Sequence, residues 1–372
     1  MSNLVLYRKY RPKSFEEVAG QEHVVRTLTN ALAMDKVAHA YLFTGPRGTG
    51  KTTIARLLAK AVNCENRTGH KSCGKCPACV EINNGKSMDL IEVDAASNRG
   101  IDEIRELRDG IQFSPSKLKY KIFIIDECHM LTREAFNALL KTLEEPPAHA
   151  IFVLATTEIQ KIPQTIISRC QRFDFYKLTL EKIVARLAWI SKQEKVAIEK
   201  EALELVALNA DGAMRDGESL LGQIMSMEDK QITLKEVQDI LGVVDIRSVQ
   251  ELAGFLAEKK NSEAIHHINE IFGKGYDPVQ FTKSFINYLR KMMILKVDPE
   301  LAKLIAIELT KEQLDVITGQ GEKFSQPDLI KTIRLFIQAE NEVKSADFPQ
   351  LPLELAVVEC CGENSALPKP NE

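Results

Sequence analysis

A glycine-rich stretch at residues 45–52 has the residue types and spacing of a phosphate-binding loop, G-x-x-x-x-G-K-T. Its glycines allow backbone N–H groups to converge on an anion, and the dipole of a following helix adds positive potential there. Lys51 can reach the β- and γ-phosphates of a nucleotide, and Thr52 can ligate Mg²⁺. We therefore predict an ATP site with a cradle of nine residues, which are Gly45, Pro46, Arg47, Gly48, Thr49, Gly50, Lys51, Thr52 and Thr53.

Two adjacent carboxylates, Asp126 and Glu127, can supply the second half of such a site. They follow the apolar run 121–125, so they lie where a buried strand ends, at the edge where α/β sheets bind ligands. Asp126 is the predicted metal partner, and Glu127 is the predicted group that polarises the attacking water. Because Lys51 and Asp126 are 75 positions apart (126 − 51), we expect them to follow neighbouring strands of one sheet.

Four of the eight cysteines form a cluster with the spacing C-x8-C-x2-C-x2-C. Two C-x2-C steps that share one cysteine can place four thiolates around a tetrahedral ion, which suits structural Zn²⁺. A redox dithiol and a plain surface loop are the competing interpretations. The predicted zinc ligands are Cys64, Cys73, Cys76 and Cys79.

Two arginines lie where an arginine can complete or sense a phosphate site. Arg169 closes a short helix and is a candidate finger for a neighbouring subunit's site. A surface salt bridge is the ordinary role of a lone arginine, and this alternative stays open. Arg215 opens a helix in the second half of the chain, from which it can fold onto a γ-phosphate.

The elements that must position these groups alternate between strand and helix in the first half of the chain. Apolar runs predict strands at 40–44, 89–93, 121–125, 151–155 and 171–175. Helical spacing precedes the first strand at 21–34 and lies between later strands at 53–63, 101–111 and 132–145. Buried strands alternating with helices predict a parallel sheet covered on both faces. Beyond residue 177 we expect helices, at 180–192, 201–209, 214–228 and 233–241 and then from about 245 to 358.

Length and composition limit the classes that fit. A chain of 372 residues with 44% hydrophobic residues predicts two or three domains with real cores. The net charge of −3 excludes a general polycation, so any contact with nucleic acid needs a local basic face. No apolar run reaches the ~18 residues of a membrane span, and no signal-peptide core is present. We therefore expect a cytoplasmic protein with no membrane contact.

Changes in composition suggest three domains. The expected divisions are an α/β domain at residues 1–178 with the cysteine insertion at about 64–79, a small helical domain at 179–242 and a second helical domain at 243–362. Residues 363–372 are polar and are predicted to be a disordered tail.

The tetrad at residues 126–129, D-E-C-H, also resembles the acidic box of helicases. Those enzymes resemble two stacked nucleotide domains, whereas the second half of this chain is helical, which disfavours the helicase interpretation. Two rivals of an ATPase subunit stay open. One is a helicase or translocase, and the other is a nucleotide-binding scaffold with a silent site.

Several motifs together resemble the AAA+ clamp-loader ATPases. They are the phosphate loop, the acidic pair, the A-T-T segment at 155–157, S-R-C at 168–170 and A-M-R-D at 213–216. Residues 6–12, Phe15, the G-Q pair at 20–21, the run 137–147 and the cysteine insertion narrow the resemblance to the gamma/tau subunits of bacterial DNA polymerase III. The resemblance is dense over residues 1–242 and thin beyond them.

This resemblance implies a role for each matching residue. Lys51 and Thr52 match the phosphate and Mg²⁺ ligands, and the four cysteines match a zinc module. Thr157 matches the sensor at the strand end, with Thr156 as the alternative. Arg169 matches a finger that acts in trans, and Arg215 matches a second sensor that acts in cis. The segment around the adenine is matched by Tyr7, Arg8, Tyr10, Arg11, Pro12 and Val18.

The same resemblance implies an architecture and partners. The expected fold is an AAA+ ATPase domain, a helical lid (residues 179–242) and an all-α collar (residues 243–362) that assembles subunits into an open pentameric ring. The implied function is ATP-driven loading of a sliding clamp onto primer–template DNA during replication, with residues 97–100 and Lys141 as candidate DNA contacts or solvated surface. Polymerase binding belongs to the long C-terminal extension of the tau form, and this sequence stops at residue 372.

Overall fold

The computed structural model describes residues 5–97, 110–226, 231–241, 246–298 and 311–362. The chain divides into two compact units, Met1–Leu234 and Lys235–Glu372. The expected domain boundaries after residues 178 and 242 stay predictions. Three expectations lie outside the described residues: most of the helix at 101–111, three of the four candidate DNA-contact residues at 97–100, and the tail at 363–372.

The first unit is built on five parallel strands in the order β2-β3-β4-β1-β5. Their bounds are Ala40–Thr44 for β1, Leu90–Asp94 for β2, Lys121–Asp126 for β3, Ala150–Thr156 for β4 and Gln171–Asp174 for β5. All five predicted strands are confirmed to within about one residue at either end. One expectation is wrong: Lys51 and Asp126 do not follow neighbouring strands, because β4 lies between β1 and β3.

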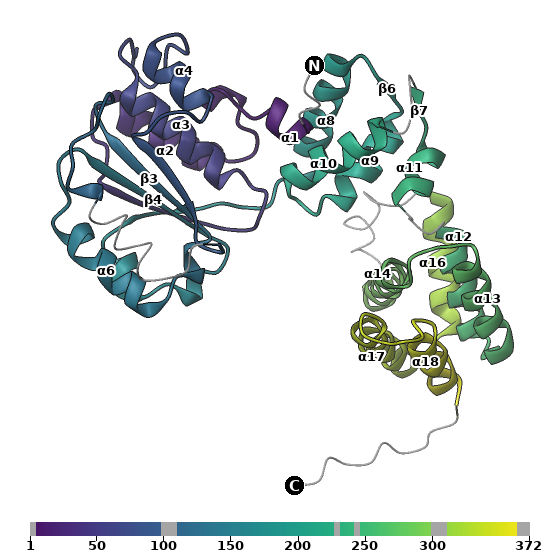
Figure 1. Cartoon of the computed structure of the whole chain (residues 1–372). Helices are drawn as coiled ribbons and strands as arrows, with labels where there is room; N and C mark the ends of the chain where they lie inside the picture. The colour runs from purple at the N-terminus through teal and green to yellow at the C-terminus, as the bar shows by residue number, and fades with distance from the viewer. Residues whose placement is uncertain (1–4, 98–109, 227–230, 242–245, 299–310, 363–372) are drawn as a thin grey trace, which may run out of the picture. The chain divides into compact units, whose positions relative to one another are not determined.

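The strands are apolar because both faces of the sheet are covered by helices (Figure 1). Side chains alternate between the two faces of a strand. In β1, Tyr41 and Phe43 pack with α2 (Glu22–Ala33) and α3 (Lys51–Asn63). Leu42 packs on the opposite face with residues of α6 (Arg133–Glu144) and α7 (Gln164–Ile167). Short elements complete this part of the chain: α1 (Leu6–Lys9), η1 (Phe15–Glu17), α4 (Pro77–Asn83), η2 (Cys128–Met130) and η3 (Ile159–Lys161).

The rest of the first unit is mainly helical, as expected. Its helices are α8 (Leu180–Glu194), α9 (Lys200–Asn209), α10 (Met214–Met225) and the start of α11 (Leu234–Leu241). The sequence did not predict a small parallel sheet formed by β6 (Ala197–Ile198) and β7 (Gln231–Ile232). Two-residue strands are too short to produce an apolar period.

The second unit is helical throughout its described residues. After the remainder of α11, its elements are α12 (Ile246–Ala257), α13 (Asn261–Gly273), α14 (Pro278–Val297), α16 (Lys311–Lys323), α17 (Gln326–Val343) and α18 (Leu351–Cys361). Asp277 begins α14 by accepting a 2.7 Å hydrogen bond from the Gln280 N–H, with Pro278 in the first turn. Phe285 and Phe336 form the centre of the core, with ring centroids 4.6 Å apart. Of the helices described in the whole chain, none is both long and apolar enough to cross a membrane.

Candidate functional site

The phosphate-binding loop joins β1 to α3 and depends on its glycines. Gly45, Gly48 and Gly50 have φ values of 142°, 76° and 103°, a region that other residues rarely adopt. A Cβ on Gly45 would lie 2.2 Å from the Phe175 carbonyl oxygen, so no larger residue fits there. These constraints give the predicted spacing of glycines a physical cause.

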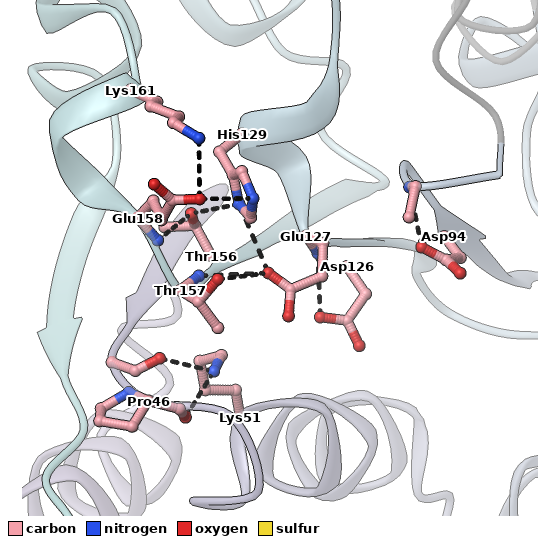
Figure 2. A network of polar contacts seen from close by, with 12 residues as sticks. Pro46, Lys51, Asp94, Asp126, Glu127, His129, Thr156, Thr157, Glu158 and Lys161 are labelled. Atoms are coloured by element: carbon pink, nitrogen blue, oxygen red, sulfur yellow. Dashed lines mark hydrogen bonds and ion pairs between the residues drawn. The ribbon is translucent and has the colours of Figure 1, made fainter. Parts of the chain in front are cut away.

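Lys51 begins α3 and is buried at the base of the loop. Its Nζ donates to the carbonyl oxygens of Gly45 at 2.7 Å and Pro46 at 2.8 Å (Figure 2). Burial lowers the pKa of Lys51, and the carboxylates of Glu127 and Asp126 act in the opposite direction. The ammonium group therefore lies between the loop and the acidic pair, where a nucleotide's phosphates would be bound.

The two predicted Mg²⁺ ligands come together although they are far apart in sequence. The Thr52 hydroxyl donates to Asp126 Oδ2 at 2.7 Å, which joins the start of α3 to the end of β3. Asp94 is a third carboxylate at this edge, and its backbone is in register with Asp126. The sequence reasoning missed Asp94, although it ends a strand just as Asp126 does. Hydroxyl and carboxylate oxygens are ligands that suit Mg²⁺.

Glu127 is held by the end of the adjacent strand, β4. The Thr157 hydroxyl donates to Glu127 Oε2 at 2.9 Å, and the Thr157 N–H donates to the same oxygen at 3.3 Å (Figure 2). Thr156, the alternative sensor, is fully buried, and its hydroxyl contacts His129 instead. Thr157 is therefore the threonine that contacts Glu127.

A cavity of about 530 Å³ lies against the loop and the acidic pair. Four of the six predicted adenine-segment residues line it, whereas Arg8 and Tyr10 do not. Tyr10 packs edge-on against Trp189 with centroids 5.5 Å apart, and the Arg8 Cζ atom lies 5.9 Å from the Tyr7 ring centroid. The residues that line the cavity include Tyr7, Arg11, Pro12, Val18, Asp94, Asp126, Glu127, Arg186, Arg215 and Glu218, together with residues 47–53.

Helix α10 contributes one expected and one unexpected charged residue to the cavity wall. The Arg215 guanidinium lies 4.8 Å from the Tyr7 ring centroid, within cation–π range. Glu218, one turn further along α10, was not predicted. Burial raises the pKa of Glu218 to about 7, while Arg186, whose Nε is 3.5 Å from the carboxylate, acts to lower it. No motif marked Glu218, because its importance depends on tertiary burial.

Arg169 and Lys141 lie outside this cavity. Arg169 follows α7, forms an ion pair with Glu144 and donates to the Thr165 carbonyl oxygen at 2.7 Å. It is absent from the cavity lining in its own chain. Lys141 is exposed on α6, and Ser97, the one described residue of the other candidate DNA segment, donates to Asp94.

The four predicted zinc ligands converge. Cys64 follows α3, Cys76 and Cys79 lie at α4, and all four Sγ atoms lie within 4.8 Å of one another. A tetrahedral site with Zn–S bonds of about 2.3 Å places sulfurs about 3.8 Å apart, so this cluster fits such a site. Backbone N–H groups of Lys75 and Cys76 lower the pKa of Cys73 to about 6, which favours the thiolate that a metal needs.

Comparison with known proteins identifies the family. Residues 20–179 match the family described as DNA polymerase III, delta subunit, 182–229 match the DNA polymerase III clamp loader subunit, ATPase lid domain, and 232–372 match DNA polymerase III subunits gamma and tau domain III. DNA polymerase III subunit tau of Bacillus subtilis is 46% identical over 97% of this chain and 64% of its own length. The gamma subunit of Buchnera aphidicola from Schizaphis graminum is 39% identical, and 90% of that protein is covered.

The chain belongs to the DNA polymerase III gamma/tau family. The family resemblance inferred from the sequence is confirmed. The predicted fold class, an AAA+ parallel sheet followed by a lid and further helices, is also confirmed. Membership of an ATPase family implies the use of nucleotide and Mg²⁺. The chain spans about two thirds of the length of Bacillus subtilis tau (64%) and about half of Escherichia coli tau (49%).

Proposed function

We propose that this chain is an ATP-hydrolysing subunit of a clamp loader, which uses ATP binding and hydrolysis to open a sliding clamp and load it on primed DNA. One observation carries the proposal. In a gamma/tau chain, the Thr52 hydroxyl meets the Asp126 carboxylate at 2.7 Å beside a cavity that the phosphate loop lines. A nucleotide site kept only for structure would not need two Mg²⁺ ligands, Thr52 and Asp126, next to a carboxylate such as Glu127.

The chain's own residues divide the work of hydrolysis. Lys51 and the loop's N–H groups bind the phosphates, and Thr52 with Asp126 would hold Mg²⁺, which neutralises phosphate charge when bound. Glu127 polarises the attacking water, and Thr157 holds its carboxylate. Arg215, at the cavity wall, senses the phosphate in cis, and Arg169 acts in trans on a neighbour's site.

The remaining assignments follow the family resemblance. Tyr7, Arg11, Pro12 and Val18 surround the adenine, and the cysteine cluster holds structural Zn²⁺. The collar (residues 243–362) assembles a pentameric ring with other clamp-loader subunits, and exposed Lys141 tracks the phosphates of primer–template DNA. From the role in replication we infer a cytoplasmic location. ATP drives the cycle if it binds the clamp-gripping arrangement more tightly, and a ratio of ~10⁴ turns a rare state into the dominant one.

ATPase measurements on the purified chain test this function. We expect slow turnover by the chain alone, and stimulated turnover after addition of partner subunits, clamp and primed DNA. Glu127→Gln should keep nucleotide affinity and lose ~10²–10⁴-fold in turnover, because the carboxylate that polarises water is gone. Lys51→Ala should weaken nucleotide binding itself.

Two results would favour the rivals. If the complete mixture bound ATP without hydrolysing it, the site would be a silent scaffold. If the chain alone unwound duplex DNA in an ATP-dependent way, it would be a helicase. Normal turnover by Glu127→Gln would assign the water to another residue.

A further inference from the structure

Glu127 occupies an unusual backbone conformation. Its φ of 47° lies in the left-handed region, which a non-glycine residue keeps only where its surroundings hold it. Every contact of its side chain among the described residues uses one oxygen, Oε2, which binds Thr157 and lies 3.4 Å from Nδ1 of His129. Because Glu127 also lines the cavity, Oε1 is the oxygen left to receive a proton from water.

His129 sits two residues later, on η2, and its side chain is 7% exposed. Both ring nitrogens have partners, as Figure 2 shows. Nδ1 lies 3.0 Å from the Thr156 hydroxyl as well as near Glu127, and Nε2 lies 3.4 Å from Glu158 Oε1. The ring is therefore fixed between the end of β3 and the segment that follows β4.

Glu158 is fixed in turn. Its N–H donates to the Thr156 hydroxyl at 3.0 Å, and its carboxylate pairs with Lys161 at 2.9 Å. Glu158 is partly exposed and Lys161 is exposed, so their ion pair is weak by itself, but it holds the carboxylate that faces Nε2 of His129. A side chain held on both sides can define the position of a third group to the accuracy that catalysis needs.

We propose that His129 is a positioning residue for Glu127. Together with Thr157 it holds Oε2, so that Oε1 faces the cavity, and Glu158 holds His129 in that orientation. This inference rests on the proposed ATPase role of Glu127. His129 is not among the described residues that line the cavity, so its effect on turnover would pass through the Glu127 carboxylate.

Three variants of His129 separate positioning from packing. Asn places a polar atom near the position of Nδ1, next to Glu127, whereas Gln places one near the position of Nε2, next to Glu158. In the full assembly with clamp and primed DNA, His129→Ala should lower kcat ~10–100-fold, with KM for ATP and the nucleotide Kd within about twofold of the native values. His129→Asn should recover part of kcat, and His129→Gln should not.

His149→Asn is the matched control, since His149 is partly buried in the same unit and, among the described residues, its side chain has one hydrogen-bond partner, the Ile111 carbonyl oxygen at 3.0 Å. It should leave kcat unchanged. Native kcat in His129→Ala, or equal kcat in the Asn and Gln variants, would overturn the inference. A rise in the nucleotide Kd that parallels the loss of kcat would also overturn it, because it would indicate a structural role for His129. If Glu127→Gln stalls while His129→Ala turns over normally, only this inference fails; if the native assembly shows no turnover, the proposed function itself fails.

Discussion

Arg169 is proposed to belong to a site that its own chain does not complete. Its guanidinium pairs with Glu144 at the end of α6 and does not line the cavity of the same chain. We predict that Arg169→Ala keeps nucleotide affinity but lowers turnover of the assembly by ~10³-fold or more, the usual contribution of an arginine finger. The measurement is the steady-state ATPase rate beside a nucleotide-binding titration.

Arg172→Ala is the control for Arg169, because Arg172 is exposed nearby on β5 and its one ion pair among the described residues is with Asp174. It should leave turnover unchanged. Native turnover in Arg169→Ala would remove the assignment in trans.

Glu218 predicts a dependence of stability on pH. Its pKa is raised by burial from the ordinary value of 4.5 to about 7 in the folded chain. The folded chain therefore binds the Glu218 proton more tightly than the unfolded chain does. The contribution of this proton to the unfolding free energy is fully present below about pH 4.5 and is lost as the pH rises through 7. We expect Glu218→Gln to exceed the native chain in unfolding free energy at pH 8 by up to about 3 kcal/mol, and by progressively less at lower pH.

Denaturant unfolding at several pH values measures this difference. Glu204→Gln on α9 is a suitable control, because Glu204 is partly exposed and, within the part of the chain that the structure describes, pairs only with Lys200 one turn away. A difference between Glu218→Gln and the native chain that stays constant with pH would show that Glu218 does not titrate as described.

At the scale of elements, α3 joins the two chemical centres of the first unit. It begins at Lys51 in the nucleotide site and ends before Cys64 in the sulfur cluster. Near its end, the buried Lys60 donates to Asn83 of α4 at 3.2 Å and to the Lys13 carbonyl oxygen. The cysteine insertion is thus attached directly to the helix that carries the phosphate loop.

Loss of the proposed zinc ion should therefore destabilise the first unit. Since a structural zinc site contributes several kcal/mol, we expect Cys79→Ser to lower the melting temperature of that unit by about 5–10 °C. Calorimetry, with zinc content measured in parallel, should show no matching shift in the transition of the second unit. Cys360→Ser, in α18, is the control. Equal melting of metal-free and metal-bound protein would mean that the cluster holds no structural ion.

Elements and motifs that depend on local pattern were predictable. The sheet strands were predictable because burial on both faces makes each one a continuous apolar run, and the phosphate loop because its φ values require glycine at set positions. The strand order was not predictable, because no local pattern in the sequence indicates that β4 lies between β1 and β3. Glu218 and His129 were also not predicted as site residues, because their importance depends on side chains that are distant in the sequence and surround them in the fold.

At the scale of the whole molecule, each unit has its own core. The second unit packs around Phe281, Phe285 and Phe336, without any strand among its described residues. All described residues that line the nucleotide cavity belong to the first unit. Nucleotide binding and the proposed assembly into a ring therefore lie in different units.

We predict that residues 1–234, produced alone, bind ATP with an affinity within about threefold of the full chain. Their turnover should not respond to partner subunits, clamp and DNA, because the proposed action of Arg169 needs an aligned neighbour and the proposed collar is missing. A nucleotide titration and an ATPase assay measure the two properties. Turnover equal to that of the complete assembly would show that the second unit is dispensable for hydrolysis.

Thr157 and Arg169 are twelve positions apart (169 − 157), joined by η3 and α7. Thr157 contacts the Glu127 carboxylate, which lines the cavity of its own chain, and Arg169 is proposed to serve the adjacent subunit. Because this stretch is short, we expect a displacement of Thr157 to be transmitted to Arg169. In the proposed ring, this connection would pass a change at one nucleotide site to the neighbour on one side only, so hydrolysis would have a direction around the ring.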